Sequence, residues 1–379
     1  MSVRKRSWIT RKGETKEAWI VDYFDQNRQR TIKTFERKKD ADAYLTTVKH
    51  EVKEGIHTAP SKSVTVAKAA EDWISYVEGE GRERSTVEQY RQEVKHHIVP
   101  RLGNEKLARL TAPRINAFRD DLLKRLSRPM AKKVLFSLKA ILKDAKRRGN
   151  VAQNVADDVS IITSSRMKLK LEIGRDIPTR EEVRRIIDAS SGKGRALLLT
   201  AALTGMRASE LRGLRWSDVD LAKQVIHVRQ RADRYHKIGS PKSSAGTRDI
   251  PIEAMVVSTL REWKLQCPKG EANLVFPTGI GTVESLPNIW ARILEPAQIA
   301  AGVVIKGKAK YGMHALRHFY ASWCINQKKD GGLELPPKTV QTRLGHSSIT
   351  MTFDRYGHLF PTGDDGKEMA AAVRAIFAT

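Results

Sequence analysis

The sequence predicts a multidomain protein: a small β-sheet-plus-helix N-terminal domain, an all-α middle domain and a mixed α+β, mainly helical C-terminal domain. Three observations predict this. The length of 379 residues exceeds that of most single domains. Two stretches rich in turn-forming or polar residues, 58–63 and 163–178, separate segments with different hydrophobic patterns. The hydrophobic fraction of 40% is high enough to build folded cores.

The first domain is expected over residues 1–58. Trp19 to Phe24 and Thr31 to Phe35 are β-prone runs joined by the turn-forming residues 25–28. Residues 38–54 have apolar side chains at helical spacing, and Gly55 marks the end of that helix. A small sheet with one helix is as common among inert scaffolds as among domains that read a DNA groove, so the pattern leaves both open.

The middle domain, 64–160, shows helical periodicity throughout. The predicted inward-facing residues of its four helices are Val66, Ala70, Trp73, Ile74 and Val77; Val87, Tyr90 and Val94; Ile115, Phe118 and Leu122; and Val134, Leu135, Leu138, Ile141, Leu142 and Ala145. Ser85 and Glu88 have the spacing of a capping box at the start of the second helix. On the fourth helix Lys132, Lys139, Lys143 and Lys146 form a separate basic stripe, which favours contact with DNA phosphates over a merely solvated face.

The third domain, 176–379, mixes helices and strands. Thr179 is expected to cap a helix, and residues 196–203 read as a buried helix. Residues 224–229 and 248–252 read as strands that flank a basic loop, with helices around 315–325 and 338–344. At the end of the chain an apolar stripe at helical spacing consists of Met369, Ala372, Val373, Ile376 and Phe377. This terminal helix can pack on its own core or on a neighbouring molecule.

The charge points to a polyanionic partner. The chain has 69 Lys and Arg against 43 Asp and Glu, a net charge of +26. The segments 1–58, 59–165 and 166–379 carry +5, +8 and +13, so no single tail holds the excess. Nucleic acid is the leading candidate and an anionic membrane surface the second.

The cysteines and the hydropathy pattern place the chain in a reducing compartment. Cys267 and Cys324 are far apart and form no CxxC pair, which excludes a disulfide framework and a cysteine-based zinc site. No apolar run approaches the length of a membrane span, and the basic amino terminus is not followed by an apolar stretch. The expected location is the cytoplasm, or the nucleoid within it.

Four short strings in the third domain carry chemistry when taken together. They are Thr204-Gly-Met-Arg207-Ala-Ser-Glu210-Leu, Pro241-Lys242 before Arg248-Asp-Ile-Pro, His314-Ala-Leu-Arg317-His318, and Leu344-Gly-His346 with Tyr356 ten residues further on. Each string alone is weak, because single arginines, histidines and tyrosines usually have structural roles. Together they supply the side chains needed for phosphoryl transfer without a metal.

The charge of the transition state explains why these residue types are needed. A phosphodiester gathers negative charge on its non-bridging oxygens as it reacts, and guanidinium groups match those oxygens bidentately. Arg207 and Arg317 would form that clamp, and Glu210 would orient an arginine or a histidine. Tyr356 would be the nucleophile. An unperturbed tyrosine hydroxyl has a pKa of about 10, so it needs a group that takes its proton before it can attack at neutral pH.

The remaining side chains have proton-transfer or hydrogen-bonding roles in this scheme. His314 lies three residues before Arg317 on the same helical face and would take the tyrosine proton. Lys242, on the loop between two strands, would act as general acid for the departing 5′ oxygen, and His346 would donate a hydrogen bond to the phosphate. Lys237 lies on the same loop and is the alternative catalytic lysine.

A zinc site is the rival interpretation of the histidine pair. His314 and His318 are four residues apart, which is zinc-ligand spacing. The hydrolytic zinc motif has a glutamate after its first histidine, and Ala315 stands there instead. A third ligand would have to come from His346 or elsewhere. We therefore expect no metal, and we interpret His318 as a structural hydrogen-bond partner.

The strings Arg207-Ala-Ser-Glu210, Lys242, His314-Ala-Leu-Arg317-His318, Leu344-Gly-His346 and Tyr356 resemble the signature of tyrosine site-specific recombinases of the phage-integrase family. The resemblance covers the whole third domain, which would be a catalytic domain of the tyrosine-recombinase type with a C-terminal exchange helix. The segments 64–160 and 1–58 are similar to that family's core-site-binding and arm-site-binding domains.

The resemblance implies a mechanism and partners. Tyr356 would form a 3′-phosphotyrosyl intermediate on double-stranded DNA recombination sites, without ATP, metal or another cofactor. The protein would work as a homotetramer on DNA through a four-way junction, with DNA-bending or directionality factors as possible partners and no membrane. It would be encoded by a bacterium or a phage and would integrate or excise a phage or genomic island. The residues 328–337 are longer than the family pattern and are expected to form a surface loop.

Two other functions remain open. A type IB topoisomerase shares this chemistry, but it needs neither a terminal exchange helix nor a separate amino-terminal domain. A binding-only architectural or regulatory DNA protein with a relic site would have lost some of the six catalytic residue types.

Overall fold

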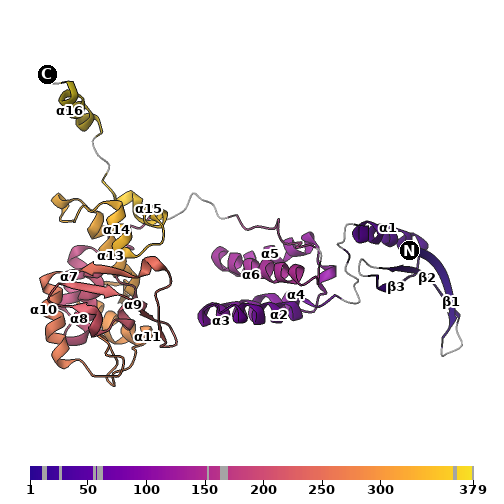
Figure 1. Ribbon diagram of the computed structural model, residues 1–379, viewed down its shortest axis with the longest axis horizontal. Helices are drawn as coiled ribbons and strands as arrows, with labels where there is room; N and C mark the ends of the chain where they lie inside the picture. Colours follow the sequence, from indigo (N-terminus) through magenta and orange to yellow (C-terminus); the bar gives the residue numbers. More distant parts are fainter. Residues whose placement is uncertain are drawn as a thin grey trace. The chain divides into compact units, whose positions relative to one another are not determined.

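The computed structural model describes residues 1–10, 15–24, 28–53, 57, 63–151, 153–162, 170–361 and 365–377 (Figure 1). The chain forms two compact units, Met1–Arg166 and Met167–Thr379. The predicted turn at 25–28, the helix end at Gly55 and the predicted linkers at 58–63 and 163–178 lie wholly or partly outside the described residues. No helix in the described ranges is long and apolar enough to cross a membrane.

The amino-terminal part of the first unit is a three-stranded antiparallel sheet with one helix. Its elements are β1 (Ser2–Ile9), β2 (Thr15–Phe24), β3 (Arg30–Phe35) and α1 (Lys38–Lys53), with the strands in the order β1-β2-β3. Val21 and Tyr23 on the central strand pack with Ala41 and Val48 of the helix in a small separate core. The predicted strands and helix are therefore confirmed.

Strand β1 was not predicted from the sequence. Its residues are exposed almost throughout, and several are basic, so they show none of the apolar alternation that indicates a strand. The strand is defined by its pairing with β2, in a register that sets Arg4 opposite Ile20 and Trp8 opposite Lys16. An edge strand with charged side chains is a common way to prevent edge-to-edge aggregation.

The second part of the first unit is helical, as predicted (Figure 1). Its helices are α2 (Val66–Gly79), α3 (Arg84–Glu93), α4 (Val99–Leu102), α5 (Ala112–Arg125) and α6 (Arg128–Arg147). One π-helical turn, Val94–Ile98, joins α3 to α4 just before Pro100, where the ring removes a backbone donor. The aliphatic stripe of α6, which includes the fully buried Leu138 and Ile141, lies at the centre of this core.

The predicted capping box at Ser85 and Glu88 is wrong. Helix α3 begins at Arg84 and its N-cap is Glu83, two residues before the predicted cap. The carbonyl of Glu83 accepts hydrogen bonds from the backbone nitrogens of Thr86 and Val87, at 2.8 and 3.1 Å. Ser85 is therefore already inside the first turn, where its side chain cannot cap the helix.

The second unit is mainly helical around a small antiparallel sheet. Its longer helices are α7 (Arg180–Asp188), α8 (Gly192–Thr204), α10 (Ala254–Gln266), α13 (Met313–Ile325), α14 (Pro337–Leu344), α15 (Ile349–Tyr356) and α16 (Asp365–Phe377), and its shorter ones are α9 (Ala208–Gly213), α11 (Leu286–Ile289) and α12 (Glu295–Ala300). The three-stranded sheet has the order β4 (Val219–Asp220), β5 (Val225–Val228), β8 (Arg248–Pro251). Two further pairs are β6 (Arg231–Ala232) with β7 (Ile238–Gly239), and β9 (Val304–Ile305) with β10 (Lys308–Ala309).

Helix α8 is buried and packs against both α10 and α13, so it forms the centre of the second unit. The predicted cap at Thr179 is confirmed, since its side chain and that of Glu182 form a complete capping box for α7. The predicted strands correspond to β5 and β8, which pair in antiparallel register. The residues 328–337 lie at the surface, as expected, with Leu333 and Leu335 bonded through their backbones to α13.

The terminal stripe forms a helix, and its large side chains remain exposed. Within α16, Met369, Val373, Ile376 and Phe377 are 66%, 47%, 73% and 77% exposed. Of the two placements that the sequence allowed, packing of this stripe on the chain's own core does not occur.

Candidate active site

Two helices of the second unit end in glycine, and both ends meet α13. Gly205 follows α8 and Gly345 follows α14, with φ of 61° and 64°, the left-handed conformation that ends many helices. The space at Gly205 is also restricted, because a Cβ there would lie 2.4 Å from Cδ1 of Tyr320 on α13. These ends place the strings around Arg207 and His346 beside the string that contains Arg317.

Arg317 joins the two helix ends. Its Nη1 donates to the carbonyl of Gly205 at 2.7 Å, and its Nη2 donates to the carbonyl of Leu344 at 2.5 Å. The side chain is buried, and no carboxylate pairs with it among the residues that the structure describes. Burial and the nearby Arg207 lower the pKa of Arg317 to about 9, so the group stays charged at neutral pH. The negative ends of two helix dipoles stabilise this cation.

Arg207 is held in place by a buried carboxylate. Its Nη1 donates to Glu210 Oε1 at 2.7 Å, and its Nη2 donates to the carbonyl of Gly345 at 2.9 Å. Arg248, which was not predicted as a site residue, donates to both oxygens of Glu210, at 3.2 and 2.9 Å. Burial alone would raise the pKa of Glu210, but Arg248 and Arg207 lower it overall. Glu210 therefore orients an arginine, one of the two options that the sequence allowed.

The Tyr356 hydroxyl is buried beside a histidine. Tyr356 is the last residue of α15 and is 1% exposed, and its oxygen lies 2.6 Å from Nδ1 of His318. Burial raises the pKa of Tyr356 to about 12, although the positive charges of Arg317, Arg355 and Arg207 act in the opposite direction. The hydroxyl is therefore protonated at rest, and it donates its hydrogen to His318 in the tautomer whose Nδ1 carries no hydrogen.

Both histidines of α13 are uncharged at neutral pH. Burial and neighbouring positive groups lower the pKa of His314 to about 4 and that of His318 to about 3. The two rings lie edge to face with centroids 4.5 Å apart. The predicted hydrogen-bonding role of His318 is therefore found at the hydroxyl of Tyr356. Among the described residues, no group of three or more metal-ligating side chains includes this pair.

His346 also lies close to the tyrosine. Its ring is parallel to that of Tyr356, within 7°, with centroids 6.4 Å apart. Its Nδ1 lies 2.9 Å from Oγ1 of Thr352, a residue that the sequence reasoning did not single out. Burial and the nearby arginines lower the pKa of His346 to about 3, so this ring is also neutral.

The two candidate lysines lie on the segment between β6 and β8. Lys237 and Lys242 are both exposed. The 3-10 turn after Lys242, Ser244–Gly246, lies against Gly345, where a Cβ would be 2.8 Å from the carbonyl oxygen of Ala245. The loop therefore reaches the edge of the site, and the choice of Lys242 over Lys237 stays a prediction.

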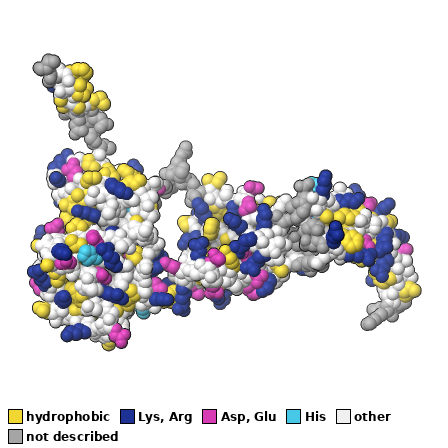
Figure 2. Space-filling model, viewed as in Figure 1, with side chains coloured by type: hydrophobic (Ala, Val, Ile, Leu, Met, Phe, Trp, Pro, Cys, Tyr) yellow, Lys and Arg dark blue, Asp and Glu magenta, His cyan; other side chains and the backbone are white. Residues whose placement is uncertain are grey.

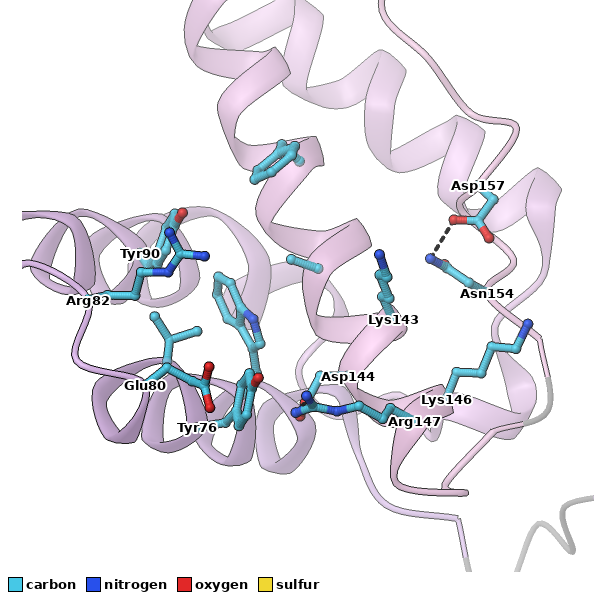
Figure 3. A pocket seen from close by; sticks show the side chains of 14 residues that line it. Tyr76, Glu80, Arg82, Tyr90, Lys143, Asp144, Lys146, Arg147, Asn154 and Asp157 are labelled. Carbon is cyan, nitrogen blue, oxygen red and sulfur yellow. Dashed lines mark hydrogen bonds and ion pairs between the residues drawn. The ribbon is translucent and has the colours of Figure 1, made fainter. Parts of the chain in front are cut away.

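The predicted lysine stripe lies on α6 in the first unit. Lys132, Lys143 and Lys146 are exposed, and the Nζ of Lys139 donates to the carbonyl of Asp157 at 2.8 Å. Lys143 and Lys146 border a cavity of about 1020 Å³ whose lining includes aromatic side chains (Figure 3). Lys and Arg side chains are also spread over both units in the face shown in Figure 2.

The chain is similar to known proteins in both sequence and fold. Residues 178–362 match the sequence model of the Phage integrase family. The chain is 26% identical to a "Tyrosine recombinase XerC-like" protein of Caldanaerobacter subterraneus subsp. tengcongensis, over 89% of this chain and 90% of the relative. It is 25% identical to an integrase of Streptomyces ambofaciens, over 90% of each chain.

The fold is similar to solved structures of integrases. A Tn1549 transposon integrase in complex with a circular intermediate DNA matches with a TM-score of 0.63 and 20% identity, over 83% of this chain and 100% of that one. A lambda integrase tetramer bound to a Holliday junction matches with a TM-score of 0.58 and 19% identity, over 91% and 96%. The class defined by this fold and site is that of the tyrosine recombinases. Residues 178–362, with the whole cluster just described, belong to the phage integrase family.

Proposed function

We propose that the chain catalyses site-specific DNA recombination, integrating or excising a phage or a genomic island. The observation that carries this proposal is the buried guanidinium of Arg317, bonded only to neutral carbonyls in the described residues, in the same cluster as the Tyr356 hydroxyl. A buried cation without a carboxylate partner suits an anionic ligand. A scissile phosphate would supply that anion and meet the nucleophile at once.

Cleavage would proceed by direct displacement at phosphorus. The Tyr356 oxygen forms a bond to phosphorus while the bond from phosphorus to the 5′ oxygen breaks, which leaves a 3′-phosphotyrosyl link. The tyrosine proton moves to the histidine pair of α13, in which His318 lies at hydrogen-bonding distance from the hydroxyl and His314, the predicted acceptor, lies beside it. Lys242 gives a proton to the departing 5′ oxygen. A 5′-hydroxyl of the partner duplex then reverses these steps.

The phosphate itself would be held by Arg207, Arg317 and His346. The two guanidinium groups stabilise the charge that develops on the non-bridging oxygens, and His346 donates one hydrogen bond. No step in this scheme uses ATP or a metal, because the phosphotyrosyl link conserves the bond energy.

The other parts of the chain would bind and assemble the DNA. We assign arm-site binding to 1–58, core-site binding with the α6 lysines to 64–160, and catalysis to 176–379. The lambda integrase tetramer on a Holliday junction supports a homotetramer here, in which the exposed stripe of α16 docks on a neighbouring protomer. DNA-bending or directionality factors would assist. The cell would be bacterial, with the protein in the cytoplasm at the nucleoid.

Covalent trapping tests the proposal directly. Wild type and Tyr356→Phe are incubated, in EDTA, with labelled duplexes that span the two ends of the genetic element encoding the chain. We expect DNA that migrates with protein in SDS for the wild type and none for the variant. The matched control is Tyr235→Phe, in the segment after β6, which should form as much adduct as the wild type.

Each other outcome points elsewhere. An adduct made by Tyr356→Phe would reject the assigned nucleophile. A wild-type adduct that forms without EDTA and disappears in EDTA would favour a zinc site. DNA binding without an adduct would favour an architectural protein. Relaxation of supercoiled DNA that lacks these sites would favour a topoisomerase.

A further inference from the structure

Thr352 is a buried polar residue within the nucleophile's own helix. It lies on α15 four residues before Tyr356, on the same face, and its relative exposure is 0%. A threonine inside a helix usually bonds back to the carbonyl four residues earlier, as Thr342 does to Lys338 at 3.0 Å. The Thr352 hydroxyl instead lies 2.9 Å from Nδ1 of His346.

The direction of this hydrogen bond follows from counting donors and acceptors. Within the described residues the Thr352 hydroxyl has no other hydrogen-bond partner. If Nδ1 of His346 carried the hydrogen and donated it, the hydroxyl hydrogen of Thr352 would be buried without an acceptor, which is costly. If the hydroxyl donates to Nδ1, both groups are satisfied. The second arrangement leaves the single hydrogen of the neutral imidazole on Nε2.

The Nε2 atom is available to a ligand. It takes part in no hydrogen bond among the described residues, and it is not among the buried polar atoms that lack a partner, so it is accessible. The backbone of His346 is fixed as well, since its N–H donates to the Gln341 carbonyl and its own carbonyl accepts from the Gln341 side chain, at 3.1 and 3.0 Å. The contact with Thr352 is the hydrogen bond of the imidazole ring itself, and it sets the tautomer.

We propose that Thr352 is a positioning residue for strand cleavage, whose hydroxyl keeps His346 in the tautomer with hydrogen on Nε2, ready to donate to the scissile phosphate. The proposal rests on the proposed function for the identity of the anion. Thr352 and Tyr356 lie one turn apart on α15, so a movement of this helix shifts the hydroxyl that orients His346 together with the attacking oxygen.

Kinetics with three variants test the role of the hydroxyl. Thr352→Val removes the hydroxyl at nearly equal volume, Thr352→Ser retains it, and Thr342→Val is the matched control. In single-turnover trapping with the duplexes described above, we expect Thr352→Val to form the adduct about 10–100-fold more slowly, by analogy with residues that orient metal-ligating histidines. The other two variants should remain close to the wild type.

A double-mutant cycle separates this role from a structural one. In a His346→Ala background the hydroxyl has no imidazole to orient, so Thr352→Val should cause no further loss. An equal loss in both backgrounds, or a wild-type rate for Thr352→Val, would overturn the proposal.

The tautomer can be observed without any DNA. Full-length protein labelled with ¹⁵N-histidine should show His346, assigned from His346→Ala, with its hydrogen on Nε2, and Thr352→Val should lose that preference. A wild-type His346 with its hydrogen on Nδ1 would reject the inference. This measurement stays decisive if no adduct forms, so failure of the proposed function is distinguishable from failure of the inference.

Discussion

The helical part of the first unit and the polar cluster of the second unit bury opposite kinds of side chain. In the helical part, Leu138 and Ile141 are fully buried while Lys143 on the same helix is exposed. In the cluster, Arg317, Glu210 and Arg248 are themselves buried. The first arrangement follows the usual distribution of apolar and charged residues. The second must be held together by the surrounding scaffold.

The physical cost of the two arrangements differs. A fully buried leucine or isoleucine stabilises the fold by about 1.5–3 kcal/mol. A buried charge destabilises it unless hydrogen bonds or partners compensate. In the cluster the carbonyls at the ends of α8 and α14 and the shared Glu210 provide this compensation. We infer that this region is built for an anionic reaction centre rather than for stability, and three predictions test the contrast.

The largest expected effect is that of Arg317→Lys. A lysine keeps the charge, but its single ammonium group cannot join both helix ends and contact a phosphate in fork geometry. We expect adduct formation to fall by about 10²–10³-fold, as for loss of one preorganised donor. Arg195→Lys, at a half-exposed arginine of the same unit, is the control and should leave the rate unchanged. Comparable rates for both variants would show that charge alone is sufficient at position 317.

Acid should weaken the cluster selectively. The pKa values of His318 and His346 are lowered to about 3, from about 6.5 in the unfolded chain. Between these values the unfolded state binds more protons, so the free energy of unfolding of the second unit decreases as the pH falls below about 6.5. The slope is at most about 1.4 kcal/mol per pH unit for each histidine.

Urea unfolding at pH 7, 6 and 5 measures this slope. Replacement of both histidines by glutamine should make the dependence in the second unit shallower, leaving the part contributed by His314, whereas His236→Asn, at an exposed position, should not change it. A wild-type stability that is constant from pH 7 to 5 would contradict the expected burial of these imidazoles.

The short motifs predicted much of the composition of this cluster, but not the hydrogen bonds and ion pairs that connect its members. Residues that share a motif, such as Arg207 with Glu210, are close because helical spacing makes them so. The structure also brings together motifs that are far apart in the chain, as the bond from Arg317 to the Leu344 carbonyl shows. The pairing of Glu210 with Arg248 joins residues 38 positions apart, and no local pattern reveals it.

Spacing could not decide between equivalent neighbours. His314 and His318 lie on one face of α13, so either could have met the tyrosine, and only the packing of α15 selects His318. Thr352 was overlooked because buried threonines carry no sequence signature. Strand β1 was missed for a related reason, since its charged residues are ordered by pairing with β2 and not by burial.

The smallest expected effect concerns the exposed side of the contrast. Lys143→Gln combined with Lys146→Gln should weaken binding to duplex DNA without changing the stability of the helical part, because both side chains are exposed. If each lysine neutralises one phosphate, the slope of log K against log salt should fall by about 0.9 per lysine. Fluorescence anisotropy measures this slope between about 50 and 200 mM salt, a range over which the DNA affinity of such proteins falls by about 10³–10⁵-fold.

Lys124→Gln, at an exposed lysine on α5 away from the stripe, is the control. An unchanged slope for the double variant would mean that the α6 stripe is only a solvated surface and that other parts of the chain contact the DNA.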